Sequence, residues 1–488
     1  MTAAVMGIDS STQSCTVELR HAGTGHLLSS GRAPHPTTRP PVSEQHPQDW
    51  WDALVLASRA AIAALEEPVE VVGVSVGAQC HGLVATDRDG RLIRPAKLWN
   101  DTTSGPQARA MLADRGAPWW AEQVGLLPSA AITISKLAWL AEHEPDAIPR
   151  IDRLHVPHDW LTFRLTGRHV TDRSDASGTG YYSSHTGRWR PDLLQEFVGE
   201  RDWSGALPQV LGPEESAGRV TDEAAAALGI TAGAVVGPGG GDQHLAAQGI
   251  GLQPGDCAYS LGTSGVVLAS SDTPVHDTTG EIDGVADVTG RWLPLVCTLN
   301  ATKVTDTVAR LLDVDHATLG DLALAAPVTP DRPVLAAYLD GERSPRLPEA
   351  RGMLSGLAGD LSREQLALAA FEGVVLGLWR GARRMVDFGV PDHGRAIVLG
   401  GGARSAAYRQ VVADLSGRDT ITVDAPEATA RGAAVQAAAL VHGESVAAMT
   451  RHWAPETVSV TTPRDDRATG LVDRYQRLAA VQADGTTF

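Results

Sequence analysis

The stretch 237–265 constrains this chain most, because it contains two glycine-rich turns that each adjoin an apolar run. In the first turn, three glycines precede Asp242, which is expected to open a short helix. Glycines let a bulky polar ligand approach the backbone, and the first N–H groups of a helix favour anions. The second turn, 261–265, lies between the expected strands 257–260 and 266–270 and would aim its amide groups at phosphate oxygens. The stretch therefore offers a carboxylate beside amide groups that can bind phosphate.

The same residues have a simpler interpretation, in which both turns only reverse the chain and Asp242 caps its own helix. Glycine-rich turns are common, so one such turn is weak support for catalysis. The rest of the chain has to decide between the two interpretations.

Composition limits the partners of the chain. Its 488 residues are enough for at least two domains, and an apolar fraction of 43% supports a sizeable core. The formal net charge of -17 argues against nucleic-acid and membrane-surface partners, which usually need a basic face. Lysine occurs only at Lys97, Lys136 and Lys303, and arginine carries nearly all other positive charge. Any phosphate site must therefore be built locally.

The four cysteines are widely spaced, and no two of them have metal-ligand spacing. We therefore expect neither a zinc site nor a disulfide framework. The N-terminus reaches Asp9 before a long apolar run develops, and no later segment is apolar enough for a bilayer, so no signal peptide or membrane span is expected. These observations predict a cytoplasmic protein.

The N-terminal residues predict a hairpin with a polar turn. Residues 3–8 form an expected buried strand, 16–20 the returning strand, and 9–14 the turn between them. The turn carries hydroxyls and amides that could face a phosphate, and Asp9 could hold a hydrated magnesium ion. Alternatively, Asp9 caps its own turn as an ordinary Asx-turn.

A helix and a strand lead to two polar side chains. Residues 48–65 have helical spacing and should pack on a sheet, and the expected strand 69–76 follows them. Ligands of α/β proteins collect at the carboxyl ends of strands, where Gln79 and His81 could hydrogen-bond a polyol. A histidine in a turn is also common as a solvated or capping residue.

Farther along the chain, Trp99 offers an apolar surface for the C–H face of a sugar, and Asp101 offers an acceptor for hydroxyl groups. A buried tryptophan beside a helix N-cap explains the same residues. Residues 171–178 are an expected polar turn, which either faces a cleft or is an exposed loop.

The C-terminal half repeats the pattern of strand, glycine turn and helix. Expected helices cover 302–312 and 363–388, and the expected strand 396–399 leads into 400–405, whose sequence is GGGARS. A third glycine turn at a strand end suits the adenosine of a nucleotide, although many α/β crossovers use such a turn only for close packing.

In this order, the motifs resemble those of the FGGY family of carbohydrate kinases from end to end, and most closely those of the members that act on D-xylulose. GIDSSTQS is similar to the first phosphate loop of the family, and AQCHG and LWND are similar to its sugar-contacting loops. GGGDQ resembles the loop that carries the base, and SLGTSG resembles the second phosphate loop. YLDGERSP and GGGARS complete the order.

Two longer family patterns are also present: one comprises 133–136 with Trp139 and His143, and the other comprises Gly352, Leu354, Gly356, Leu357, Gln365 and 369–372. The chain departs from the family at Ala78 and Cys80, where the members that act on D-xylulose commonly have Gly and Met. These departures affect the identity of the sugar and leave the reaction class unchanged.

The resemblance implies an α/β fold with two ribonuclease-H-like, actin-like ATPase domains and an active-site cleft between the domains. We place the boundary between an N-terminal domain, 1–246, and a C-terminal domain, 247–488. The implied reaction phosphorylates a primary hydroxyl with ATP and Mg²⁺ and converts D-xylulose to D-xylulose 5-phosphate, with another ketopentose or a pentitol as the alternative substrate. The expected partners are the sugar and ATP, and a homodimer is left open.

By the same resemblance, Asp242 would be the general base and Asp9 would organise the magnesium ion. The sugar would be held by residues of two loops and by the base: Gln79, Cys80, His81, Trp99, Asp101 and Asp242. ATP would be bound by residues of three turns: Thr12, Gly262, Thr263, Gly401, Gly402 and Ser405.

Two other classes of function fit part of the pattern. A dinucleotide-dependent dehydrogenase needs a glycine fingerprint at one strand–helix junction, with an acidic residue about 20 positions later. None of the three turns has that form, and a Walker-A lysine motif is absent from the sequence. A non-catalytic actin-like sugar sensor would keep the fold but lose Asp242 or Asp9, and both are present.

Overall fold

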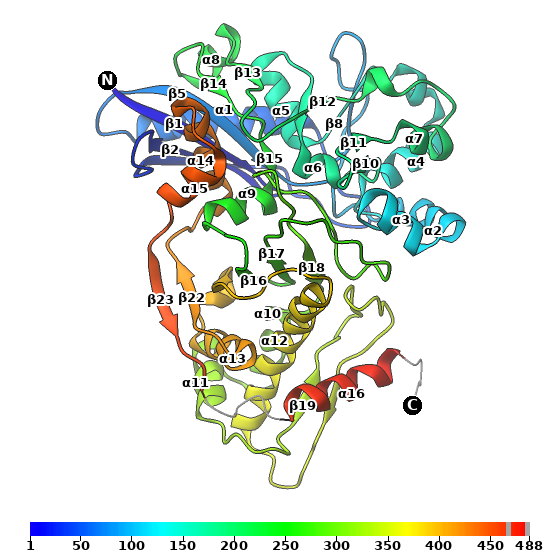
Figure 1. Ribbon diagram of the computed structural model, residues 1–488, viewed down its shortest axis with the longest axis vertical. Coiled ribbons are helices and arrows are strands. Elements are labelled where there is room, and N and C mark those ends of the chain that lie inside the picture. Colours follow the sequence, from blue (N-terminus) through cyan, green and yellow to red (C-terminus); the bar gives the residue numbers. More distant parts are fainter. Residues whose placement is uncertain (465–469, 484–488) are drawn as a thin grey trace. The chain divides into compact units, whose positions relative to one another are not determined.

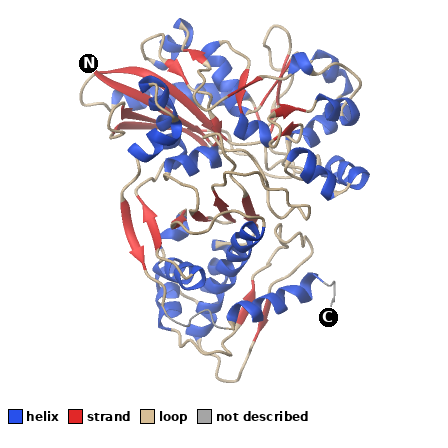
Figure 2. Ribbon diagram, in the orientation of Figure 1, coloured by secondary structure: helices blue, strands red, loops and turns tan. Residues whose placement is uncertain are grey.

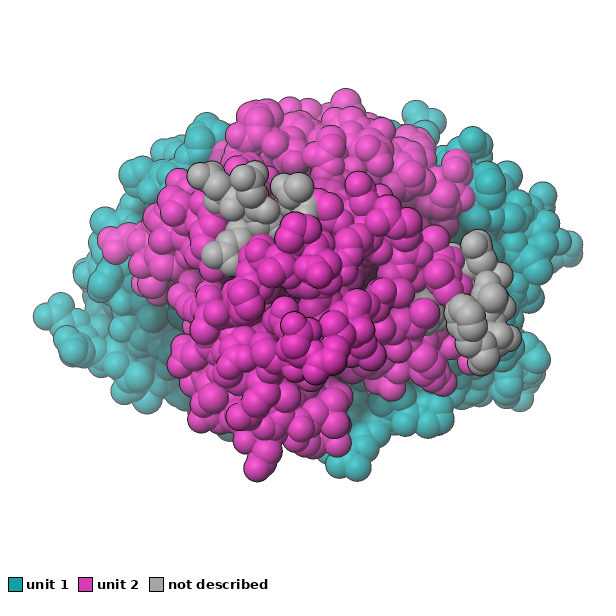
Figure 3. Space-filling view, turned by 90° about the horizontal axis from the view of Figure 1, so that it is seen from below, with its two compact units in different colours: residues 1–251, 284–292, 425–455 teal, residues 252–283, 293–424, 456–488 magenta. Residues whose placement is uncertain are grey.

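Figure 1 shows the computed structural model of the chain, which describes residues 1–464 and 470–483. The chain divides into two compact units, coloured differently in Figure 3. Unit 1 comprises Met1–Gly251, Gly284–Trp292 and Ala425–Pro455, and unit 2 comprises Leu252–Asp283, Leu293–Asp424 and Glu456–Phe488. Both units contain helices and strands (Figure 2). Each unit is assembled from three segments, and the expected domain boundary after residue 246 stays a prediction.

Unit 1 is built on a seven-stranded mixed sheet of β1 (Thr2–Ser10), β2 (Ser14–His21), β3 (Leu27–Pro34), β5 (Val69–Ala78), β13 (Gly218–Arg219), β14 (Val235–Val236) and β15 (Gly240–Gly241). The strand order is β13-β14-β5-β1-β2-β3, and β15 also pairs with β5. Strand β1 runs antiparallel to β2 and parallel to β5, so β1 is central and the expected N-terminal hairpin forms one half of the sheet.

Two helices cover opposite faces of this sheet. Alternate residues of a strand point to opposite faces; in β1, Met6 packs with α1 (Pro47–Ala63), whereas Val5 packs with α14 (Ala428–His442). Gly7 faces α14, and an added Cβ at this position would collide with the backbone of that helix. Helix α14 therefore completes the core of unit 1 although it comes from the C-terminal part of the chain.

The other helices of unit 1 are α2 (Gly105–Arg115), α3 (Ala117–Val124), α4 (Thr133–His143), α5 (Pro157–Thr166), α6 (Arg173–Ser177), α7 (Pro191–Phe197), α8 (Asp222–Leu228), α9 (Asp242–Gly249) and α15 (Val446–His452). Short strands pair in two-stranded sheets: β4 (Glu44–Gln45) with β7 (Ala96–Lys97), β6 (Val84–Thr86) with β8 (Arg153–His155), β9 (Val170–Asp172) with β12 (Gln209–Leu211), and β10 (Tyr182–Ser183) with β11 (Arg188–Trp189). Most of these elements form one long insertion between β5 and β14, and the insertion begins at the expected sugar residue Gln79.

Unit 2 is built on a six-stranded sheet of β16 (Cys257–Leu261), β17 (Gly265–Ala269), β18 (Leu295–Thr298), β21 (Ala396–Leu399), β22 (Thr420–Val423) and β23 (Thr457–Thr461). Its helices are α10 (Thr302–Leu312), α11 (His316–Ala325), α12 (Arg363–Asp387), α13 (Ala406–Ser416) and α16 (Leu471–Ala483), and β19 (Val334–Ala336) pairs with β20 (Met353–Ser355). The long helix α12 packs on β17 and β18, where Leu378 joins Val267 and Val296 in a buried apolar core.

The two sheets share one topology. In unit 1 the order β3-β2-β1-β5-β14 combines an antiparallel meander with strands parallel to β1, and in unit 2 the order β18-β17-β16-β21-β22 does the same. The turn between β1 and β2 therefore corresponds to the turn between β16 and β17. The expected α/β fold with two sheet-containing domains is confirmed.

Asp9 lies in strand β1 and not in the turn where the sequence pattern places it. The strand extends to Ser10, because Asp9 is paired on both sides, with Thr16 of β2 and with Gly77 of β5. The bend itself is confined to residues 11–13.

In the described residues, no helix is both long and apolar enough to cross a membrane. The cytoplasmic location stays a prediction.

The contact between β1 and α14 gives a stability prediction. We expect Gly7→Ala to destabilise the protein by about 1–3 kcal/mol, the usual range for overpacking, because the new methyl group would displace the backbone of α14. Thermal and denaturant unfolding followed by circular dichroism would measure the change.

Gly199→Ala is the matched control within unit 1, because an added Cβ there meets nothing within 4 Å. We expect its effect to stay within about 0.5 kcal/mol. Equal stability of the Gly7→Ala protein and the parent would contradict the proposed closeness of β1 and α14.

Candidate active site

Asp9 carries a buried carboxylate oxygen near the end of β1. Its Oδ1 atom has no hydrogen-bond partner among the residues that the structure describes. Burial raises the pKa of Asp9 well above its usual value, and the charges of Asp242 and Glu427 act in the same direction. A carboxylate of this kind would be stabilised by a hydrated cation.

Asp242 opens helix α9 directly after β15. The expected turn of three glycines is wrong in part, because Gly240 and Gly241 form this strand and pair with β5. Its Oδ1 accepts a hydrogen bond of 2.8 Å from the amide of Gln243 and lies 3.4 Å from Sγ of Cys80. The hydroxyl of Thr429 on α14 donates to the carbonyl oxygen of Asp242 at 3.2 Å. Gly241 has no room for a side chain, because an added Cβ would collide with Sγ of Cys80. Strand β15 therefore holds Asp242 between the end of β5 and α14.

The carboxyl group of Asp242 has a raised pKa. Burial raises the pKa to about 6, although the amide of Gln243 and the thiol of Cys80 favour the charged form, and the charge of Asp175 adds to the rise. Such a group is largely ionised at neutral pH and is a stronger base than an ordinary aspartate. It is suited to accept a proton from a hydroxyl group.

Asp175 belongs to a buried ionic cluster around His158 of α5. Nδ1 of His158 lies 3.0 Å from Asp175, and Nε2 lies 3.1 Å from Asp159 and 3.6 Å from Asp172. Burial opposes the charge of His158, but the three carboxylates outweigh it and raise its pKa to about 9. The expectation of a polar turn or exposed loop at 171–178 is therefore wrong, because these residues form the end of β9 and helix α6, most of them are buried, and Asp172 and Asp175 contact His158.

His81 lies in the loop that follows β5 and has a left-handed backbone conformation, with φ of 64°, which is unusual for a residue other than glycine. Its Nδ1–H donates to the carbonyl oxygen of Gly178 at 2.8 Å. Its own carbonyl oxygen accepts hydrogen bonds from Thr133 and Lys136 of α4. These contacts hold the loop in one conformation.

A ring of hydrogen bonds lies beside the first phosphate turn. The hydroxyl of Thr12 donates to Gln79 at 3.3 Å, Nε2 of Gln79 donates to Gln45 at 3.4 Å, and Nε2 of Gln45 donates to the carbonyl oxygen of Thr12 at 3.0 Å. The indole of Trp99 donates to the hydroxyl of Thr12 at 2.9 Å, and the indole of Trp50 donates to Gln45 at 2.7 Å. The structure thus joins a residue expected at the nucleotide to two residues expected at the sugar.

Trp99 and Asp101 differ in exposure. Trp99 is 46% exposed, so part of its indole is accessible to a ligand. Asp101 is fully buried, accepts hydrogen bonds from Ser43 and Thr103, and lies 3.4 Å from Nζ of Lys97. Burial opposes the charge of Asp101, but these hydrogen bonds outweigh it and hold its pKa below the usual value. These neighbours already occupy the carboxylate of Asp101, and sugar binding by Asp101 stays a prediction.

In unit 2, the second phosphate turn is the hairpin between β16 and β17. The carbonyl oxygen of Gly262 accepts a hydrogen bond from the amide of Thr302 at 2.9 Å, and that of Thr263 accepts one from Ala301 at 3.2 Å. The turn is thereby tied to the start of α10, while the side chains of Thr263 and Ser264 remain exposed.

The third glycine turn packs directly on strand β16. Gly400 has a φ of 78°, and an added Cβ there would lie 2.8 Å from the carbonyl oxygen of Leu261. At Gly402 an added Cβ would lie 2.7 Å from Cβ of Leu261. Only glycine allows the short helix Gly401–Arg404 to lie this close to the second phosphate turn.

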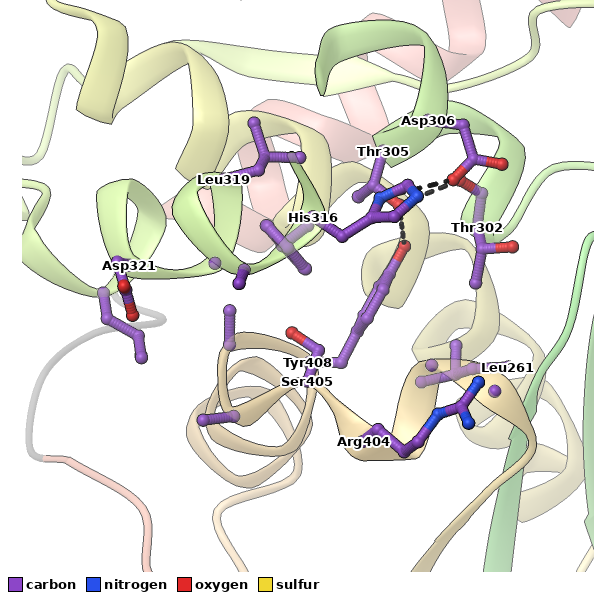
Figure 4. A pocket seen from close by; sticks show the side chains of 18 of the residues that line it. Leu261, Thr302, Thr305, Asp306, His316, Leu319, Asp321, Arg404, Ser405 and Tyr408 are labelled. Carbon is purple, nitrogen blue, oxygen red and sulfur yellow. Dashed lines mark hydrogen bonds and ion pairs between the residues drawn. The ribbon is translucent and has the colours of Figure 1, made fainter. Parts of the chain in front are cut away.

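These two turns open onto a cavity of about 720 Å³ within unit 2, a volume in the range of small-molecule and cofactor sites (Figure 4). The expected ATP-binding residues of unit 2 all line it: Gly262, Thr263, Gly401, Gly402 and Ser405. On its wall, the hydroxyl of Tyr408 lies 3.1 Å from that of Thr305, and the Tyr408 ring packs edge-on against Phe371. Figure 4 also shows His316 beside Asp306, with 3.7 Å between Nδ1 of His316 and Oδ1 of Asp306.

Helix α11 forms another wall of the cavity, and no sequence-based prediction covered it. A signal was present, because Asp315 caps the helix by accepting a hydrogen bond of 2.7 Å from the amide of Thr318. Leu319 and Ala323 follow at helical spacing and are buried. Gln45, Phe371 and Tyr408 were likewise not anticipated as parts of the site.

With this geometry in view, the chain matches known proteins over nearly its whole length. The FGGY family of carbohydrate kinases matches with its N-terminal domain over residues 4–249 and with its C-terminal domain over residues 257–441. The chain belongs to this family, and it is a carbohydrate kinase.

Individual relatives are similar over most of the chain. The xylulose kinase of Streptomyces coelicolor is 43% identical over 451 residues, which cover 92% of this chain and 90% of that protein. The xylulose kinase of Streptomyces rubiginosus is 41% identical over 484 residues, which cover 98% and 96%. The crystal structure of xylulose kinase from Bifidobacterium adolescentis has a TM-score of 0.88 at 35% identity and covers 98% of this chain and 99% of that one.

The hydrogen-bonded ring gives a prediction for the first phosphate turn. Gln45→Leu keeps the volume of the side chain but leaves the carbonyl oxygen of Thr12 and the indole of Trp50 without their partner. We expect amide hydrogen exchange in peptides that span residues 10–14 to accelerate at least about fivefold, the equivalent of one lost hydrogen bond. Exchange measured by mass spectrometry tests this.

Gln107→Leu serves as the control, because Gln107 is half-buried on α2 and its Nε2 donates to Glu142, so it is not part of the ring. Parental exchange rates at residues 10–14 in the Gln45→Leu protein would mean that the ring does not hold the turn.

Proposed function

We propose that this kinase transfers the terminal phosphoryl group of ATP to a primary hydroxyl of D-xylulose and forms D-xylulose 5-phosphate. The observation that carries the proposal is Asp242, a carboxylate with a pKa of about 6 at the start of a helix, directly after the glycine strand β15. The identity of 43% and 41% with two xylulose kinases supports the choice of sugar.

In this proposal, Asp242 accepts the proton of the attacking hydroxyl group as the bond to phosphorus forms. Phosphoryl transfer passes through a loose transition state, so alignment and charge neutralisation matter more than covalent help. The carboxylate would also hold the sugar hydroxyl in place by a hydrogen bond before transfer. The glycine strand β15 and the hydrogen bond from Thr429 would fix the position of Asp242.

The sugar would lie against the loop that follows β5 and against Trp99. The half-exposed indole of Trp99 can cover the C–H face of a sugar, and Gln79 and His81 carry polar groups that can bind hydroxyls. Cys80 contacts Asp242 in the structure, so Cys80 would act on the base as well as on the sugar.

ATP would occupy the cavity of unit 2, with its base and ribose near Gly401, Gly402 and Ser405 and its phosphates near Gly262 and Thr263. The inclusion of all five residues in the lining of one cavity supports this assignment. Thr12, in the corresponding turn of unit 1, would complete the phosphate contacts.

A magnesium ion fits the chemistry of Asp9. Mg²⁺ keeps several water molecules and is usually bound by one or two carboxylates. Oδ1 of Asp9 is buried, has no partner in the described part of the chain, and belongs to a group whose raised pKa marks it as short of positive charge. Asp9 would therefore hold the ion. When bound with ATP, such an ion neutralises charge on the phosphate oxygens.

Another ketopentose or a pentitol is the alternative substrate. Cys80 favours this alternative, because the members that act on D-xylulose commonly have methionine at its position. Cysteine is smaller than methionine, and Cys80 lies beside the base. The reaction and the role of Asp242 would be the same for either substrate.

A coupled assay of ADP release with a panel of pentuloses, pentitols and hexuloses tests the proposal. We expect the highest kcat/KM with D-xylulose, and a loss of at least about 10²-fold in turnover for Asp242→Asn, the usual scale for removal of a general base. Sugar binding should be largely retained, because the amide preserves shape. Turnover within a few-fold of the parent would exclude Asp242 as the base.

The pH profile of the parent is the second arm of this test. Because burial raises the pKa of Asp242 to about 6, the base loses its charge as the pH falls through that value. We expect kcat/KM to decline below about pH 6, whereas an aspartate with an ordinary pKa would stay active to about pH 4.

The magnesium assignment is tested with Asp9→Ala. We expect the Mg²⁺ concentration for half-maximal rate to rise at least about tenfold with little change in the KM for the sugar, because Asp9 would act on the metal-nucleotide complex. A magnesium titration superimposable on that of the parent would leave Asp9 with a structural role only.

A further inference from the structure

Two of the three lysines of this chain are buried beneath the expected sugar loops. Lysine and arginine together number 41, and only three of them are lysine. Lys136 is fully buried and Lys97 is 1% exposed, both in unit 1, whereas Lys303 is partly exposed and pairs with Asp340 in unit 2. In a chain that uses arginine almost everywhere else, a buried lysine points to a place where the shape of the ammonium group matters.

Lys136 holds the backbone of two segments at once. Its Nζ donates to the carbonyl oxygen of His81 at 2.9 Å and also to that of Ala131. The hydroxyl of Thr133 donates to the same carbonyl oxygen of His81 at 3.1 Å. His81 has the left-handed conformation, which is strained for a residue with a side chain, so the donors on α4 stabilise a conformation that the loop would otherwise leave.

The burial of Lys136 is unfavourable in itself. Burial lowers the pKa of Lys136 to about 7, because an ammonium group separated from water loses hydration. A methionine would fill the same space without this penalty. The retained amino group therefore serves its two carbonyl partners.

Lys97 acts on the second sugar loop in a similar way. Its Nζ lies 3.4 Å from Asp101, 3.0 Å from Glu44 and 2.8 Å from the hydroxyl of Thr103. The same ammonium group lies 3.8 Å from the centre of the Trp139 ring, and Trp139 is on α4 together with Lys136. Helix α4 thus supports both loops, which explains why 133–136 and Trp139 belong to one sequence pattern.

We propose that Lys136 is a positioning residue that fixes the carbonyl groups of His81 and Ala131 and thereby shapes the sugar site, with Lys97 holding Asp101 in the neighbouring loop. The proposal rests on the proposed function, because it takes these loops to bind the sugar. A planar guanidinium group is larger than an ammonium group and cannot direct compact tetrahedral donors at two carbonyls in the same space. Arginine should therefore fail at this position.

Lys136→Met tests the proposal, because it keeps the length of the side chain and removes its donors. We expect the KM for D-xylulose to rise at least about tenfold, with a smaller change in kcat and with sugar-independent ATP hydrolysis at the parental rate. Ser58→Ala is the control: it removes a buried donor to the carbonyl oxygen of Leu228 in the same unit and should leave the KM unchanged. A parental KM in folded Lys136→Met protein overturns the proposal.

Two more variants keep the test decisive if Lys136→Met does not fold. Thr133→Val removes one of the two side-chain donors to His81 and should raise the KM about threefold, a partial hydrogen-bond loss. Lys136→Arg should raise the KM despite its positive charge. A parental KM in either folded variant contradicts the proposal.

The outcome also separates this inference from the proposed function. A parent that phosphorylates no sugar of the panel contradicts the proposed function. An active parent with unchanged KM in the Lys136 and Thr133 variants contradicts only the positioning role.

Discussion

The close packing of helix α14 within unit 1 depends on glycine. At Gly7 of β1, Gly249 of α9 and Gly432 of α14, an added Cβ would collide with a backbone carbonyl of the facing element. Because no side chain stands at these three positions, α14 lies directly against the strand that carries Asp9 and the helix that begins with Asp242. Two carboxylates from distant parts of the chain thereby share one rigid support, and preorganised charge is what phosphoryl transfer needs most.

The turns of the site follow from local rules, and the sequence predicts them well. Alternating apolar residues around 11–13 and 262–264 specify hairpins. Before Asp242 the prediction of a turn misses strand β15, because the pairing of Gly240 and Gly241 with β5 is a contact between distant residues. The long helix α12 matches its predicted range almost to the residue, because Ser362 and Gln365 form a capping box at its start. Features whose cause lies in neighbouring residues can therefore be inferred from sequence pattern alone.

Other parts of the site depend on contacts between distant residues, which sequence pattern does not reveal. Asp175 stands in a run of polar residues that is typical of an exposed loop, but its partner His158 lies in another helix and makes burial of both groups possible. The side chain of Gln45 is satisfied by Thr12, Trp50 and Gln79, which come from three different segments. Such polar networks have no periodicity, so pattern analysis cannot detect them.

The same helix α14 imposes an order on biosynthesis. Residues 425–455 belong to unit 1, although they follow the parallel strands of unit 2 in the chain. The part of the first sheet that packs on α14, which includes Val5 and Val72, is therefore uncovered until residue 442 has left the ribosome. The nascent chain carries an unfinished apolar surface through most of its translation, and a product that stops before α14 would present that surface to other chains instead of to α14.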